Sequence, residues 1–64
     1  MMVWAIRFNH QDDGRPVYWR GVEATDLDYT GEPADAAHFS TESLAKQAIA
    51  GDLGGSGEAV ELDL

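Results

Sequence analysis

Residues 39–51 read Phe39-Ser-Thr-Glu-Ser-Leu-Ala-Lys-Gln-Ala-Ile-Ala-Gly51 and predict a helix together with both of its ends. Ser40 suits the N-cap position, because its hydroxyl can accept hydrogen bonds from the free N–H groups of the first turn. Glu42 places a negative charge where the helix dipole favours one, and Gly51 stands where helices commonly end in a left-handed residue. We therefore expect a helix over residues 41–50.

One face of this helix is predicted to be buried. An apolar stripe at helical spacing is formed by Leu44, Ala45, Ala48 and Ile49. Phe39 at N′ and Leu44 at N4 have the spacing of a hydrophobic staple, which fixes the angle at which the chain enters the helix. A helix of about ten residues is marginal in isolation, so we expect the stripe to pack against another element.

A β-hairpin is expected over residues 3–22. The alternation of side chains over residues 3–8 is typical of a strand, and residues 17–22 predict a second strand. Gly14 follows two Asp residues between these segments and can adopt a positive φ without strain, which is the chemistry of a turn.

The register of the hairpin depends on the length of its turn. A two-residue turn at Asp13-Gly14 places Phe8 opposite Trp19, whereas a three-residue turn places Tyr18 opposite Phe8. We favour Phe8 opposite Trp19, which is a good aromatic pair.

The remaining segments follow from composition. Residues 23–39 form an acidic connector, in which Pro33 is expected to begin a single helical turn. Residues 51–57 form a glycine-rich loop after the helix. Residues 59–64 alternate apolar and acidic side chains and predict a third strand.

These elements predict a two-layer ββαβ domain of the α+β class that spans residues 1–64. The large apolar side chains expected to share one face of a three-stranded sheet are Trp4, Ile6, Phe8, Trp19, Val60 and Leu62. The helix covers this face and returns the chain along the sheet, so the last strand lies antiparallel beside the first, in the order 2-1-3. A chain of this size buries only about 60% of its unfolded surface, which leaves both a monomer and a homodimer open.

Acidic residues dominate the charge. Twelve Asp and Glu against four Lys and Arg give a net charge of −8, and residues 21–64 alone carry −9 against +1 for residues 1–20. Direct binding to nucleic acid or to an anionic membrane is disfavoured, because attraction to phosphates requires cations on the protein. We expect a basic protein surface as the partner. No apolar run approaches the length of a membrane span or signal peptide, so we expect a cytoplasmic location.

The predicted topology brings several acidic segments to one end of the sheet. The candidate partner-binding residues at this acidic pole are Glu23, Asp26, Asp28, Glu32, Asp35, Glu42 and Asp63. Adaptation to high salt is the alternative explanation of the acidity, and it would spread charge over the surface instead of concentrating it.

The pattern Ala36-x-x-Phe39-Ser40-Thr41-x-x-x-Ala45, ahead of a Gly-ended helix and a closing strand, resembles small proteins carried by phages and mobile elements. The likeness covers residues 36–50 and the order of elements. Some small, strongly acidic proteins of that origin are anti-CRISPR proteins, which block a CRISPR effector complex by occupying its basic nucleic-acid channel. The resemblance implies a phage inhibitor acting in the host cytoplasm, and it carries over no functional residues.

Catalytic and metal chemistry are not expected. The absence of Cys excludes thiolate ligands and disulfides. The segment Asp26-x-Asp28-x-Thr30-Gly31 copies the first half of an EF-hand calcium loop, but position 12 is Ala37, where a bidentate Glu is required. We therefore expect no enzyme, no cofactor and no metal.

Three functional hypotheses remain. The leading one is a non-enzymatic acidic protein that imitates a nucleic-acid backbone and blocks a basic groove. The second is an adaptor that recruits a partner through the exposed edge of strand two or strand three, or through Tyr18 and Tyr29. The third is a salt-adapted acidic domain. Mimicry should weaken steeply as salt is raised, whereas edge pairing should not.

Overall fold

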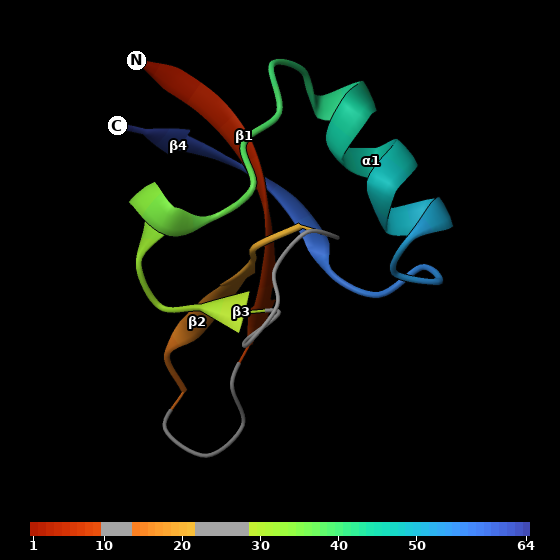
Figure 1. Cartoon of the computed structure of the whole chain (residues 1–64), viewed down its shortest axis with the longest axis horizontal. Coiled ribbons are helices and arrows are strands. Elements are labelled where there is room, and N and C mark those ends of the chain that lie inside the picture. Colours follow the sequence, from red (N-terminus) through yellow and green to blue (C-terminus); the bar gives the residue numbers. More distant parts are fainter. Residues whose placement is uncertain (10–13, 22–28) are drawn as a thin grey trace.

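The computed structural model describes residues 1–9, 14–21 and 29–64. In this part of the chain a four-stranded antiparallel sheet packs with one α-helix, in the α+β class that the sequence predicts (Figure 1). In chain order the elements are β1 (Met2–Asn9), β2 (Pro16–Trp19), β3 (Tyr29–Thr30), the single 3₁₀ turn η1 (Pro33–Asp35), α1 (Glu42–Gly51) and β4 (Glu58–Asp63). The strand order is β3-β2-β1-β4.

The core of the predicted topology is confirmed. β1 is central, β2 pairs with one of its edges, and the last strand pairs antiparallel with the other. The three-stranded ββαβ description is wrong, because Tyr29–Thr30 adds a fourth strand beside β2. β3 is only two residues long, so it is too short to show the alternating pattern by which strands are predicted from sequence. The Tyr29 ring packs edge-on against Phe8, with ring centroids 5.0 Å apart, and this contact ties the short strand to β1.

Both predicted hairpin registers are wrong. Phe8 lies opposite Val17, and the ladder between β1 and β2 begins with Asn9 opposite Pro16. Residues 10–15 therefore connect the two strands, which makes the connection longer than either predicted turn. The positive φ expected at Gly14 is confirmed, at 73°.

The sheet is covered on both faces. On the face toward α1 the buried side chains are Ile6, Trp19 and Ala45, and on the opposite face they are Ala5, Tyr18 and Ala36. Val60 and Leu62 pack on the face away from the helix, contrary to our expectation. The register explains this arrangement, since Val60 lies opposite Ala5 and Ala59 lies opposite Ile6, and directly opposed residues share a face.

The helix begins one residue later than predicted. Its N-cap is Thr41 and not Ser40, and the Thr41 hydroxyl accepts a hydrogen bond from the Leu44 N–H at 3.2 Å. The buried N4 position is therefore Ala45, whereas Leu44 at N3 is 44% exposed. With Thr41 as the N-cap, Phe39 and Leu44 do not occupy the N′ and N4 positions of the predicted hydrophobic staple.

The end of the helix also differs from expectation. Gly51 lies inside α1 and is not among the glycines with a positive φ. The left-handed residues follow it, at Gly54 with φ 61° and Gly55 with φ 92°, where the chain turns back toward β4.

The segment between η1 and α1, residues 36–41, leads from one face of the sheet to the other, because Ala36 packs on one face and Ala45 of α1 on the opposite face. Ala37 donates to the Trp19 carbonyl at 2.8 Å, and Phe39 and Trp4 exchange two backbone hydrogen bonds of 2.8 Å each. The segment thus pairs with β1 on the side opposite β4. Figure 1 shows the result, with α1 on one side of β1 and η1, in light green, on the other.

Candidate acidic binding surface

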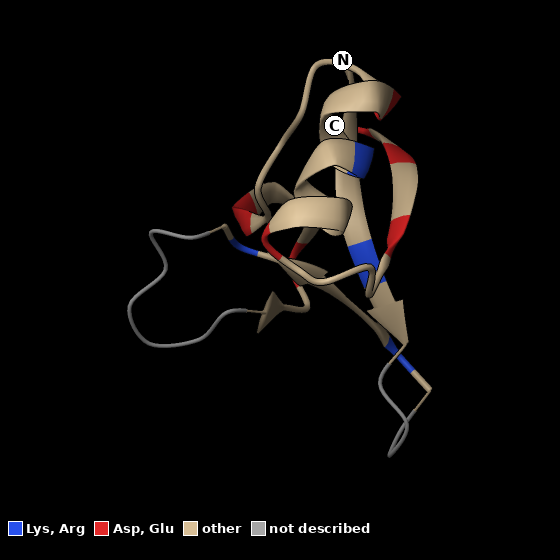
Figure 2. Ribbon diagram, turned by 90° about the vertical axis from the view of Figure 1, so that its right-hand side faces the viewer, with Lys and Arg blue, Asp and Glu red and all other residues tan. Residues whose placement is uncertain are grey.

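Every acidic side chain in the described part of the chain is exposed. These residues are Glu32, Asp35, Glu42, Asp52, Glu58, Glu61 and Asp63. Figure 2 marks acidic positions in red on the ribbon, among them those along β4, at the start of α1 and around η1. Of the candidate partner-binding residues, Glu23, Asp26 and Asp28 lie outside the described residues.

The structure brings Glu32 and Asp35 together at η1. Glu32 flanks the turn, its carbonyl accepts from the Asp35 N–H at 3.0 Å, and its own N–H donates to the Thr30 hydroxyl at 3.1 Å. Pro33 occupies the first position of the turn, where its fixed φ suits helical geometry. These local bonds hold the backbone of the turn while both carboxylates stay exposed to solvent.

Glu42 is the first residue of α1, where the helix dipole favours a negative charge. Its carboxylate also lies 3.7 Å from the Lys46 ammonium, one turn along the helix. Both side chains are at least half exposed, so this pair contributes little to stability.

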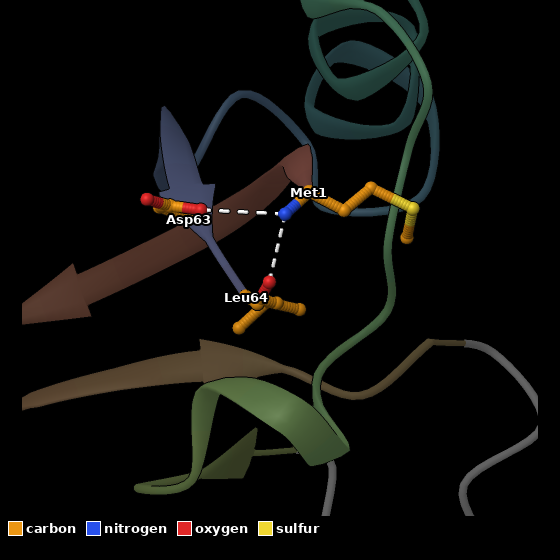
Figure 3. A network of polar contacts seen from close by, with 3 residues as sticks. All are labelled: Met1, Asp63 and Leu64. Carbon is orange, nitrogen blue, oxygen red and sulfur yellow. Dashed lines mark hydrogen bonds and ion pairs between the residues drawn. The ribbon is translucent and has the colours of Figure 1, made fainter.

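Asp63 is the last residue of β4 and lies beside the amino end of β1. Its carboxylate lies 3.3 Å from the Met1 amine, which also donates to the Leu64 carbonyl at 2.8 Å. Figure 3 shows both contacts as dashed lines. The starts of β1 and α1 and the end of β4 lie at one end of the molecule in Figure 1. Glu42 and Asp63 therefore belong to that end. Glu32 and Asp35 lie at η1, on the side of β1 opposite α1.

The candidate set predicted from the sequence does not include Glu58 and Glu61, because it contains only acidic residues of segments expected to converge at one end of the sheet. Glu58 lies opposite Arg7 and forms an ion pair with it at 2.9 Å. Glu61 lies opposite Trp4 in the middle of β4 and has no ion pair within the described residues. The available signal was the alternation of acids along residues 58–63, which marks a strand with charge on its exposed positions.

The structure gathers no metal-binding group in its described part. Residues 1–9, 14–21 and 29–64 contain no cluster of three His, Cys, Asp or Glu side chains that could hold an ion. Asp26 and Asp28 of the incomplete calcium loop lie outside these residues, and the Thr30 hydroxyl caps the Glu32 N–H. None of the described helices has the length and apolar character needed to cross a membrane.

Comparisons with known proteins identify no similar protein. The chain matches no family model, and no curated protein or solved structure is significantly similar to it. The functional argument therefore rests on the chemistry of this chain.

Proposed function

We propose that this protein is a non-enzymatic acidic binding protein that occupies a basic nucleic-acid-binding surface of a partner protein, as anti-CRISPR proteins do. The observation that carries the proposal is the exposure of all seven described carboxylates on a chain with a net charge of −8. Solvated carboxylates attract a cationic surface from a distance, and they present acceptor oxygens to the Arg and Lys side chains that otherwise hold phosphates.

Little of this negative charge is neutralised inside the described part of the chain. Arg7 pairs with Glu58, Lys46 lies near Glu42, and the Met1 amine meets Asp63. The ion pairs within these residues do not involve Glu32, Asp35, Asp52 or Glu61. Cations of a partner would therefore meet these four exposed carboxylates without breaking an ion pair within the described residues.

A basic partner follows from the same chemistry, whereas the CRISPR effector and the phage setting rest on the resemblance to small phage proteins. The partner is a protein whose groove holds nucleic acid through basic side chains, and a CRISPR effector complex is the leading case. The protein itself does not bind nucleic acid, because like charges repel. It acts in the cytoplasm, which is the host cytoplasm for a phage-encoded protein.

The test measures affinity for a purified CRISPR effector complex, with two variants that change the net charge by the same two units. Glu32→Gln combined with Asp35→Asn neutralises the pair at η1, which belongs to the proposed binding set. Asp52→Lys reverses the charge of an exposed residue at the end of α1, outside that set. The helix dipole favours a cation at this position, so the substitution should not destabilise the fold. We expect the η1 double variant to bind about tenfold more weakly and Asp52→Lys to bind nearly as tightly as the unmodified protein.

Equal losses from both variants would show that net charge alone acts and would overturn the inclusion of Glu32 and Asp35 in the proposed binding set. Absence of binding by the unmodified protein to this complex and to other basic nucleic-acid-binding proteins would overturn the proposed function and leave salt adaptation as the explanation of the acidity.

A further inference from the structure

The outer edge of β4 is open in the described part of the chain. The strand order β3-β2-β1-β4 leaves two edges, and β3, which covers the edge of β2, is only two residues long. β4 is six residues long, and its register runs without interruption along β1 from Glu58 to Asp63. It is therefore the longest free edge that the described sheet offers.

The hydrogen-bonding pattern shows which backbone groups point outward from this edge. Met1 and Leu64 exchange two hydrogen bonds of 2.8 Å, which marks them as a hydrogen-bonded pair. Such pairs alternate along an antiparallel ladder, so Leu62 and Val60 also bond to β1. The backbone groups of the intervening β4 residues, which are Ala59, Glu61 and Asp63, consequently point away from the sheet.

The geometry of β1 supports this assignment independently. Trp4 lies opposite Glu61 and turns its N–H and C=O away from β4, toward Phe39, with two bonds of 2.8 Å. In an antiparallel ladder its opposed residue must likewise turn its groups away from β1. No backbone hydrogen bond in the described chain ends on the outer edge of β4.

The side chains of β4 select what can pair with this edge. Glu61 lies opposite Trp4, which packs on the face toward α1, so Glu61 and Asp63 lie on that face. Val60 and Leu62 lie half-buried on the other face. A second copy paired antiparallel about Glu61 would place two carboxylates directly opposite each other, which is destabilising. A strand with cations opposite Glu61 and Asp63 gains both the backbone bonds and the charge pairs.

We propose that β4 binds an extended basic segment of a partner protein by antiparallel strand addition. In this segment Lys or Arg alternates with apolar residues, so that its cations oppose Asp63 and Glu61 and its apolar side chains extend the layer of Leu62 and Val60. The inference rests on the proposed function only in requiring a basic partner. It adds the site, the backbone chemistry and the sequence pattern of the segment that is bound.

The probe is the capped peptide Lys-Val-Lys-Val-Ser, whose first residue opposes Asp63 and whose last opposes Ala59. Its control has the same composition in the order Lys-Lys-Ser-Val-Val. Binding of the alternating peptide should slow amide hydrogen exchange at Ala59, Glu61 and Asp63, while Val60 and Leu62 are already protected by β1. The rearranged peptide should bind about tenfold more weakly and protect none of the three outward amides.

Two variants of Glu61 separate the contribution of its backbone N–H to binding from the contribution of its carboxylate. Glu61→Pro removes an outward N–H without breaking a bond to β1, and edge strands tolerate Pro at such positions. We expect it to weaken binding at least about tenfold, and Glu61→Gln to weaken it by less. If Glu61→Pro disturbs the amides of β1, the exchange pattern of the unmodified protein decides the question alone.

Equal binding of both peptides without protection of the outward amides would overturn strand addition, while attraction between the acidic protein and basic chains would still stand. Failure of both peptides to bind would also overturn the inference, and the effector-complex experiment would then decide the proposed function separately.

Discussion

At the scale of single residues, Gly57 is the position that the packing restricts most tightly among the described glycines. Its φ is +100°, and a Cβ built there would lie 2.7 Å from Ile6 Cγ2 and 2.9 Å from Phe8 Cζ. Gly57→Ala should therefore lower the free energy of unfolding by about 1–3 kcal/mol, measured by urea denaturation. Gly51→Ala is the matched control, because its Cβ would meet nothing within 4 Å inside α1, and it should raise stability by about 0.5–1 kcal/mol. Equal effects would contradict the packing described for Gly57.

Leu44 and Ile6 provide a second comparison of residues. Ile6 is fully buried between the sheet and α1, whereas Leu44 is 44% exposed. We expect Ile6→Ala to cost about 2–5 kcal/mol and Leu44→Ala less than about 1 kcal/mol, also by urea denaturation. A cost for Leu44→Ala as large as that for Ile6→Ala would show that the helix buries its Leu44 side.

At the scale of the elements, the start of α1 is set by Thr41. Its hydroxyl accepts from the Leu44 N–H at 3.2 Å, so Thr41→Ala should lower the free energy of unfolding by about 0.5–2 kcal/mol. The neighbouring Ser40→Ala should have little effect, because Ser40 is exposed and does not cap the helix. Thermal melting followed by circular dichroism measures both, and a larger loss from Ser40→Ala would restore the cap that the sequence alone favours.

The elements also show what could be predicted from the sequence. Alternation predicted the long strands, and the order of elements predicted β1 in the centre with β4 antiparallel to it. Ser40 and Thr41 are both good capping residues, and choosing the wrong one shifts the helix by about 100° around its axis. This shift exchanges Leu44 for Ala45 at the buried N4 position.

Other errors arise from contacts between distant segments. The sequence does not show that Ala36 packs on the second face of the sheet, so the apolar alternation alone predicts Val60 and Leu62 on the face toward α1. The acidity of the candidate surface can be predicted from composition alone. The position of its carboxylates cannot, because the hydrogen-bond pattern that turns the Glu61 backbone outward depends on the register between β1 and β4.

At the scale of the whole molecule, the net charge of −8 on a chain of 64 residues opposes folding through self-repulsion. Salt screens this repulsion, so raising the ionic strength from about 0.01 M to about 0.5 M should raise the melting temperature by several degrees. Thermal melting at a series of NaCl concentrations measures this effect. A melting temperature that falls with NaCl would show that the ion pairs of the protein outweigh the repulsion.

The same charge defines the central claim, which is that the protein displaces nucleic acid from a basic groove. Fluorescence anisotropy of labelled nucleic acid bound to a CRISPR effector complex tests it most directly, with this protein as the competitor. We predict that the anisotropy falls to the value of free nucleic acid at saturating protein, and that the protein's own affinity for the effector, measured without nucleic acid, falls steeply between about 50 and 200 mM salt. Nucleic acid that stays fully bound at saturating protein, or an affinity that does not change with salt, would contradict the account.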